Sequence, residues 1–394
     1  MTTPAGRSST HDVIVDAVKR VLPDLRSPVA LHEPSFGGNE WQYVKECIDT
    51  KWVSSAGKYV DRFEEMLKGF TGAGYAVATV NGTAALHACL LLTGVEHGDE
   101  VLIPALTFIA TANAVSYTGA RPHLVDSDTA TLGVDASKLD HYLRETAAVR
   151  DGVCRNLRTG AVIRALVPMH TFGHPVDLDA ITALCARWQI QLVEDAAESL
   201  GSYYRGRHTG NFGTVAALSF NGNKVITTGG GGAILTNDPA LAKLAKHITT
   251  TARTAHRWSF MHDQVGYNYR LPNLNAALGC AQVEQLPGFL ESKRALAQRY
   301  FDAFEDVSGV SIMREPAHCR SNYWLNALLL DRPDVAVRDR LLETLNGLGI
   351  MARPVWTLMH RLPVYADCPR MDLAQAEALD ARIVNLPSSP FLAD

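Results

Sequence analysis

Residues 75–92 read YAVATVNGTAALHACLLL, and this stretch sets the architecture that we predict for most of the chain. It begins with a short apolar strand at 75–80, passes through Gly82 and Thr83, and continues as a helix at 84–92. The same alternation recurs in strands at 101–103, 123–125, 161–167 and 191–193 and in helices at 107–117, 138–143 and 178–188. Apolar strands that alternate with helices are typical of an α/β fold, with a mostly parallel sheet flanked by helices.

The pattern changes after residue 213. Residues 214–220 and 233–236 predict two strands close enough in sequence to pair antiparallel, and a long charged helix is expected from Leu286. We therefore predict three parts: an N-terminal helix and linker at 1–40, a large domain at 41–285 and a smaller C-terminal α+β domain at 286–394. Apolar residues at helical spacing between Val13 and Leu22 indicate the N-terminal helix, which Pro23 closes.

The composition excludes several classes of function. Of the 394 residues, 47% are hydrophobic and 20% charged, and the net charge is −4, so nucleic acid is a poor partner. No apolar stretch is long enough to cross a membrane, and residues 1–9 lack the apolar core of a secretory signal. Seven scattered cysteines without a CxxC pair indicate small buried side chains in a reducing cytoplasm. No histidine spacing predicts a metal site.

Polar residues follow several of the predicted strands, at the edge of a parallel sheet where ligands bind. Gly82 and Thr83 open a helix and either cradle a phosphate or cap the helix. Asp195 follows an apolar strand as a turn residue or as a placed charge. Lys224 follows the next strand as a solvated lysine or as a nucleophilic amine. Together, a phosphate cradle, an aspartate and a lysine are the groups that pyridoxal phosphate requires.

The motifs that hold these residues resemble those of the DegT/StrS sugar aminotransferases. The motifs are NGTAAL (81–86), EDAAE (194–198) and SFNGNK (219–224), supported by PxxTF (104–108) and GYNYR (266–270). The resemblance covers roughly residues 35–290. It implies the fold type I architecture of pyridoxal-phosphate enzymes, a cytoplasmic protein and a homodimer with a shared active site.

Two C-terminal segments are similar to a narrower group, the aminotransferases of the bacillosamine and legionaminic-acid pathways. They are RPVWTLMH (353–360) and NLPSS (385–389). This resemblance implies amination of C-4 of a nucleotide-linked, UDP-type 4-keto-6-deoxy-N-acetylhexosamine, with L-glutamate as the amino donor. Another keto sugar, such as GDP-4-keto-6-deoxymannose or a 3-keto sugar, stays open as the acceptor.

The resemblance assigns roles to the core residues. Lys224 binds the cofactor covalently as an aldimine and moves the proton, and Asp195 pairs with the ring nitrogen. Gly82, Thr83 and Ser219 hold the phosphate.

Three further residues have expected roles toward the cofactor. Asn268 reaches the phosphate of the neighbouring subunit's cofactor. Phe108 stacks on the ring or is a plain core residue, and Glu198 stands where many relatives have Gln or His near the ring hydroxyl.

Ser54, Arg353 and His360 are candidate substrate residues, with a structural loop role as the alternative. A sugar 3-dehydratase of the same family would lack the Schiff-base lysine, so Lys224 argues against that activity. A non-catalytic pyridoxal-phosphate sensor is the remaining alternative, and the set of Thr83, Asp195 and Lys224 argues against it.

Overall fold

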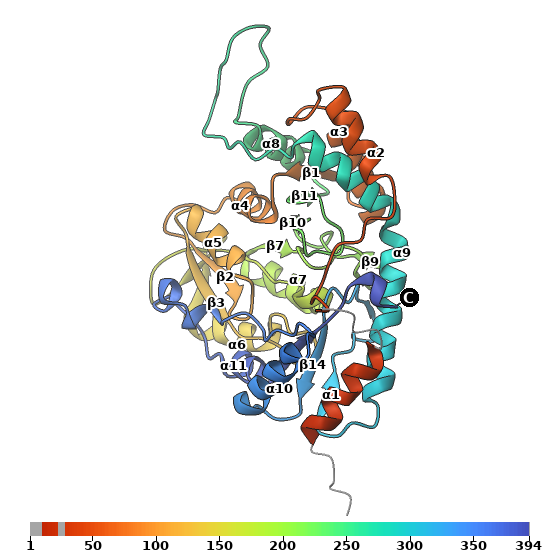
Figure 1. The fold of residues 1–394 in the computed structure, drawn as a ribbon. Helices are drawn as coiled ribbons and strands as arrows, with labels where there is room; N and C mark the ends of the chain where they lie inside the picture. Colours follow the sequence, from red (N-terminus) through yellow and green to blue (C-terminus); the bar gives the residue numbers. More distant parts are fainter. Residues whose placement is uncertain (1–9, 23–27, 394) are drawn as a thin grey trace, which may run out of the picture.

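A seven-stranded sheet forms the centre of the computed structural model, which describes residues 10–22 and 28–393 (Figure 1). Its order is β1-β11-β10-β7-β6-β2-β3. The strands are β1 (Tyr75–Thr79), β2 (Glu100–Pro104), β3 (Arg121–Val125), β6 (Ile163–Leu166), β7 (Gln191–Asp195), β10 (Val215–Ser219) and β11 (Gly232–Thr236). Only β11 runs against its neighbours in this sheet, and the other pairs are parallel. The predicted fold class and the antiparallel pair β10–β11 are therefore confirmed.

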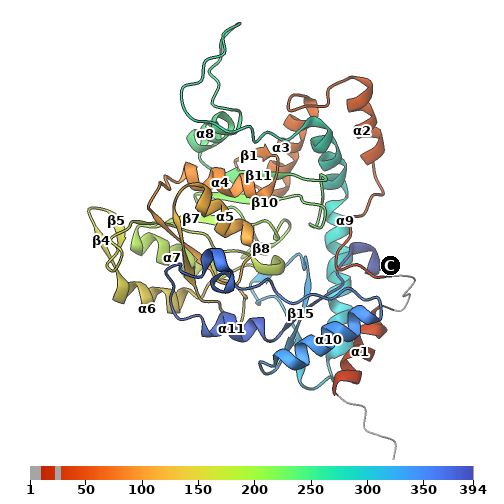
Figure 2. The ribbon, with the colours of Figure 1, turned by 60° about the vertical axis from the view of Figure 1, so that its left-hand side comes forward.

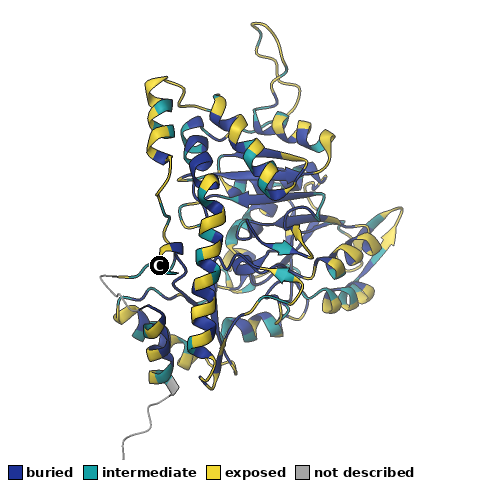
Figure 3. Ribbon diagram, turned by 90° about the vertical axis from the view of Figure 1, so that its right-hand side faces the viewer, coloured by how far each residue is buried: buried dark blue, intermediate teal, exposed yellow. Residues whose placement is uncertain are grey.

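Helices surround this sheet (Figures 1 and 2). They are α3 (Lys58–Thr71), α4 (Gly82–Leu92), α5 (Ile109–Tyr117), α6 (Ala136–Thr146), α7 (Leu178–Trp188) and α8 (Pro239–Thr249). Every residue of β2 and of β11 is buried, which is why these strands read as continuous apolar runs. Figure 3 shows the buried sheet inside helices whose outer faces are exposed.

The C-terminal part is built on a three-stranded antiparallel sheet of β12 (Val310–Ile312), β14 (Asn326–Leu330) and β15 (Ile383–Leu386). Helices α10 (Val335–Gly347) and α11 (Ala374–Asp380) belong to this part. Helix α1 (Thr10–Val21) confirms the predicted N-terminal helix and packs against α9 and α10, where Ile14 and Val18 join a second hydrophobic cluster. Pro23 and residues 1–9 lie outside the described residues.

Smaller elements complete the fold. Helix α2 (Glu40–Asp49) packs on α9, and β4 (Ala147–Arg150) pairs with β5 (Val153–Asn156) in a hairpin. A small sheet joins β8 (Tyr203–Tyr204), β9 (Arg207–His208) and β13 (Cys319–Arg320). Five of the seven cysteines are buried as predicted, whereas Cys319 and Cys368 are half-buried. Among the described helices, none has the length and apolar character to cross a bilayer.

Helix α9 (Asn273–Phe304) differs from the prediction. We expected a helix from Leu286, but the observed helix begins at Asn273 and continues through Pro287. Its first half is rich in small apolar residues that are buried on more than one side, so it lacks the one-sided spacing by which a surface helix is recognised. The predicted domain boundary at 285 therefore falls inside a continuous helix.

Candidate active site

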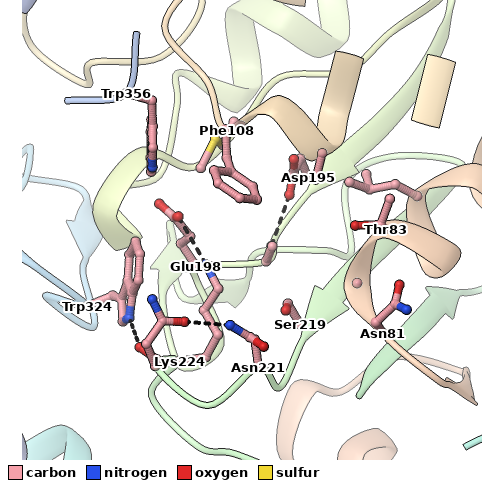
Figure 4. Close-up of a pocket in the computed structure, with 16 residues that line it drawn as sticks. Asn81, Thr83, Phe108, Asp195, Glu198, Ser219, Asn221, Lys224, Trp324 and Trp356 are labelled. Atoms are coloured by element: carbon pink, nitrogen blue, oxygen red, sulfur yellow. Dashed lines mark hydrogen bonds and ion pairs between the residues drawn. The ribbon is translucent and has the colours of Figure 1, made fainter. Parts of the chain in front are cut away.

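A cavity of about 340 Å³ lies at the carboxyl ends of the parallel strands (Figure 4). Residues that follow β1, β2, β6, β7 and β10 line it, and two tryptophans from the C-terminal part close one side. It brings together the predicted residues Gly82, Thr83, Phe108, Asp195, Glu198, Ser219 and Lys224. The structure adds Asn81, Asn221, Asn223, Trp324 and Trp356 to this set.

Lys224 lies in the tight loop that follows β10, and its side chain points into the cavity (Figure 4). The loop is held by a backbone hydrogen bond from the Lys224 N–H to the Asn221 carbonyl. The Lys224 amine lies 3.1 Å from Oε1 of Glu198 and 4.0 Å from the centre of the Trp324 ring. Its side chain is only 14% exposed, so the amine is placed between a carboxylate and an aromatic face and is largely shielded from water.

Glu198 is a fully enclosed carboxylate. Its Oε2 accepts a hydrogen bond of 2.9 Å from the backbone N–H of Phe172, a residue in the left-handed conformation (φ 56°). Burial raises the pKa of Glu198 to about 7, although the nearby Lys224 amine lowers it. The pair of Glu198 and Lys224 was not predicted from the sequence, where the two residues are 26 positions apart.

Asp195 ends β7 and is buried at the opposite side of the cavity. Its Oδ2 accepts a hydrogen bond of 2.7 Å from the Thr111 hydroxyl, and its Oδ1 accepts one of 3.2 Å from the Ala197 N–H. Burial raises the pKa of Asp195, and these two hydrogen bonds oppose that shift. No lysine, arginine or histidine of the described residues forms an ion pair with it, so the carboxylate is available to a positively charged ligand.

The N-terminus of α4 faces the same cavity. Asn81 caps this helix by accepting a hydrogen bond from the Ala84 N–H. Within the described residues, the hydroxyls of Thr83 and Ser219 have no hydrogen-bond partner. A Cβ atom added to Gly82 would lie 2.8 Å from Cβ of Ser219. The site therefore combines a helix N-terminus, two free hydroxyls and a close approach that needs glycine, which suits a phosphate group.

These groups fit pyridoxal phosphate. The phosphate cradle at Thr83 and Ser219, the unpaired carboxylate of Asp195 and the amine of Lys224 all line one cavity. The side chain of Phe108 also lines it and is 47% exposed, which leaves its ring available for stacking. Among the described residues, no group of three or more metal-ligating side chains is found.

Four predicted residues lie elsewhere. Ser54 is exposed, and its carbonyl accepts a hydrogen bond from the Asn273 N–H. Asn268 is exposed and does not line the cavity. Arg353 lines a neighbouring cavity, and His360 lies against Glu377 with 3.0 Å between Nε2 and Oε1. The structure thus does not bring Ser54, Asn268 or His360 to the lysine.

Trp324 and Trp356 are the two aromatic residues among the lining residues that sequence reasoning missed. Trp324 donates a hydrogen bond of 2.7 Å from Nε1 to the Asn223 carbonyl, which fixes the indole beside Lys224. Trp356 packs near Phe108 and Phe172, with ring centres 6.1 and 5.2 Å apart. The only signal in the sequence was that Trp356 falls within the motif at 353–360.

Comparison with known proteins agrees with this site. Residues 34–394 match the model of the DegT/DnrJ/EryC1/StrS aminotransferase family. The chain is 36% identical to the GDP-perosamine synthase of Escherichia coli O157:H7, over 93% of this chain and 94% of that protein. It is 36% identical, with the same coverage, to the GDP-perosamine synthase of Caulobacter vibrioides.

Among solved structures, the aminotransferase TlmJ from Streptoalloteichus hindustanus is similar, with a TM-score of 0.81 and 29% identity. The match covers 91% of this chain and 93% of that one. From the family match over most of its length, the cavity and the fold, we conclude that this chain is an aminotransferase and belongs to the DegT/DnrJ/EryC1/StrS family.

Proposed function

We propose that this aminotransferase moves the amino group of L-glutamate onto C-4 of a nucleotide-linked 4-keto-6-deoxy sugar, with pyridoxal phosphate held by Lys224. The observation that carries the proposal is the arrangement of one cavity. A lysine amine, an unpaired aspartate carboxylate and a free helix N-terminus line it. A sugar 3-dehydratase does not need the lysine, whereas a transaminase does.

The nucleotide is the finer part of the proposal. Three relatives named GDP-perosamine synthase are 32–36% identical to this chain over 93% of its length, which favours a GDP-linked acceptor. The motifs at 353–360 and 385–389 favour the UDP-linked N-acetylhexosamine instead. We place the GDP-linked sugar first because whole-chain similarity includes the residues around the cavity, whereas the motifs are short.

Bound pyridoxal phosphate supplies an electron sink for the carbon that loses its proton. The chain's own residues supply the rest. Asp195 holds a proton on the ring nitrogen, and Lys224 carries the proton at the reacting carbon. Glu198, with a pKa of about 7, lies 3.1 Å from the Lys224 amine and is placed to exchange a proton with it. Trp324, Trp356 and Phe108 limit the access of water to the amine.

We also propose a homodimer, on two observations. A long loop after α8, residues 250–268, projects from the body (Figures 1 and 2). It exposes Trp258 by 72%, Phe260 by 73% and Val265 by 80%. An exposed apolar group of this size is typical of a protein interface. Asn268 is the last residue of the loop and is exposed, as expected for a residue that serves the neighbouring subunit.

The central experiment separates the two half-reactions of the cofactor-loaded enzyme. Glutamate alone is expected to give 2-oxoglutarate in an amount equal to the bound cofactor. When a GDP- or UDP-linked 4-keto-6-deoxy sugar is then added, we expect its ketone to be converted to an amine. Mass spectrometry of the sugar measures this conversion. Borohydride reduction and peptide mapping are expected to place the cofactor on Lys224. Glutamate turnover without any amination of a keto sugar would contradict the acceptor, and modification at another lysine would contradict the site.

A further inference from the structure

A second cavity, of about 400 Å³, adjoins the one that holds Lys224. The two share Trp324, Trp356 and Asn223 as lining residues, so these side chains stand between them. The walls of the second cavity are mainly apolar and include Phe172, Leu325 and Val355. Its polar side chains are His32, Asn223, Arg353 and Asn385. A mostly apolar cavity with a few polar groups is the usual form of a ligand site.

His32 is the unusual residue of this cavity. It is only 8% exposed, and both of its ring nitrogens are buried without a hydrogen-bond partner in the described structure. Its backbone is nevertheless held on both sides. Before it, the Leu31 carbonyl accepts from the Ser388 N–H at 2.8 Å, and after it, the Glu33 N–H donates to the Ser389 hydroxyl at 2.8 Å. A rigidly placed imidazole with two unsatisfied nitrogens costs folding free energy unless something binds it.

Asn385 makes a second, independent observation. It comes from β15, far from His32 in the sequence, yet its Oδ1 is also buried without a partner in the described residues. Its Nδ2 lies 3.4 Å from the Pro354 carbonyl and donates to it, which identifies Oδ1 as the free acceptor. The cavity therefore contains three unsatisfied polar atoms contributed by two distant segments.

The charge state of His32 defines what these atoms can bind. Burial and the positive charges of Lys293 and Lys224 hold the pKa of His32 well below its usual value. The imidazole is therefore neutral and offers one N–H donor and one acceptor nitrogen, and the acceptor oxygen of Asn385 belongs to the lining of the same cavity. An anion cannot pair with two acceptors. A neutral group that both donates and accepts, such as a hydroxyl or an amide, can accept from the imidazole N–H and donate to one of the two acceptors.

We propose that the second cavity binds the acceptor sugar on the side remote from its keto carbon, and that His32 and Asn385 hydrogen-bond a hydroxyl or amide group there. This inference rests on the proposed function and deepens it. It makes His32 a specificity residue for the sugar, because the free groups of glutamate are carboxylates and an amine, and none of them is a neutral group that both donates and accepts. It also gives Arg353 a place at the rim of the acceptor site rather than at the cofactor.

The kinetic test compares the two half-reactions of the cofactor-loaded enzyme in His32→Leu, His32→Gln and His141→Leu. His141 is exposed and far along the chain, so it serves as the matched histidine control. His32→Leu is expected to lower kcat/KM in both half-reactions unequally: the fold-loss for the sugar is expected to be about ten times the fold-loss for glutamate. His32→Gln is expected to recover part of the loss, because its amide also donates and accepts. Equal loss in both half-reactions, or no loss, would overturn the proposal.

A binding test does not depend on turnover. Calorimetric titration of the cofactor-loaded enzyme would use UDP-N-acetylglucosamine against UDP, and GDP-mannose against GDP. The sugar part is expected to add affinity in the native enzyme, and His32→Leu is expected to abolish that gain while UDP and GDP bind as before. A larger loss with the N-acetyl sugar would identify the amide as the bound group, and a larger loss with mannose the hydroxyl. A gain that survives His32→Leu would refute the role of His32, whether or not any keto sugar is aminated.

Discussion

Gly82 at the start of α4 approaches Ser219 at the end of β10 so closely that a methyl group on the glycine would lie 2.8 Å from Cβ of the serine. Gly82→Ala is therefore expected to push the helix N-terminus away from the strand and to weaken cofactor binding about tenfold or more. The affinity is measured by titrating the cofactor-free protein with pyridoxal phosphate and monitoring the absorbance of the bound cofactor.

Gly222→Ala is the matched control, since a Cβ at that position meets nothing within 4 Å. It is expected to bind the cofactor as the native protein does. Equal affinity in both variants would show that the approach of Gly82 to Ser219 does not shape the phosphate site.

Asp195→Asn tests the carboxylate that we assign to the ring nitrogen. The amide keeps the shape and the contact with Thr111 but cannot hold a proton on the ring, so the glutamate half-reaction is expected to slow about ten- to a hundredfold. Stopped-flow absorbance with saturating glutamate measures the rate. Thr111→Val removes one hydrogen bond and leaves the charge, and it is expected to have the smaller effect. A reversed order of the two variants would contradict the assignment.

The raised pKa of Glu198 predicts a pH dependence of stability in the cofactor-free protein. Because the folded state holds this proton up to about pH 7 and a free glutamate loses it near its ordinary pKa of 4.5, the native state binds more protons between these limits. The stabilisation from Glu198 is fully present below about pH 4.5 and is lost as the pH rises through about 7.

Glu198→Gln cannot titrate, so its melting temperature relative to the native protein is expected to rise as the pH increases across this range. Thermal melts of both proteins at several pH values provide the measurement. A constant difference between the two proteins would mean that Glu198 titrates normally in the fold.

The projecting loop predicts a subunit contact. Trp258→Ser combined with Phe260→Ser removes its two most exposed aromatic rings, and the dimer is expected to dissociate at concentrations where the native protein stays paired. Light scattering after gel filtration reports the mass. Val364→Ser, at a residue that is 69% exposed outside the loop, is the control and is expected to leave the mass unchanged. A native protein that is monomeric throughout would refute the dimer.

Sequence reasoning reached the parts of the site that follow from local order. Thr83 and Lys224 come soon after a strand and Asp195 ends one. Parallel strands end at the same edge, so the convergence of these residues could be predicted. Trp324 could not be placed in this way, because its position depends on how the C-terminal part packs over the loop at Asn223. The ion pair of Lys224 with Glu198 likewise depends on the left-handed turn at Phe172, which no residue pattern indicates.

The helix α9 was misjudged for a related reason. In its first half the four consecutive residues Cys280, Ala281, Gln282 and Val283 are all buried, so its buried residues have no single face. The N-terminal helix α1, by contrast, buries one face only, and its spacing predicted it correctly. The periodic spacing of hydrophobic residues identifies helices that have one buried and one exposed face. It does not identify helices that are buried on several sides.

Helix α9 supplies side chains to both hydrophobic clusters, with Leu286 and Leu290 in one and Leu296 and Tyr300 in the other. The two clusters are therefore connected through one continuous helix. Division of the chain after residue 285 would cut this helix and expose buried hydrophobic side chains on both of the resulting fragments. The two halves of the molecule are thus expected to melt as one, in a single calorimetric transition, and to resist dissection into separately folding pieces.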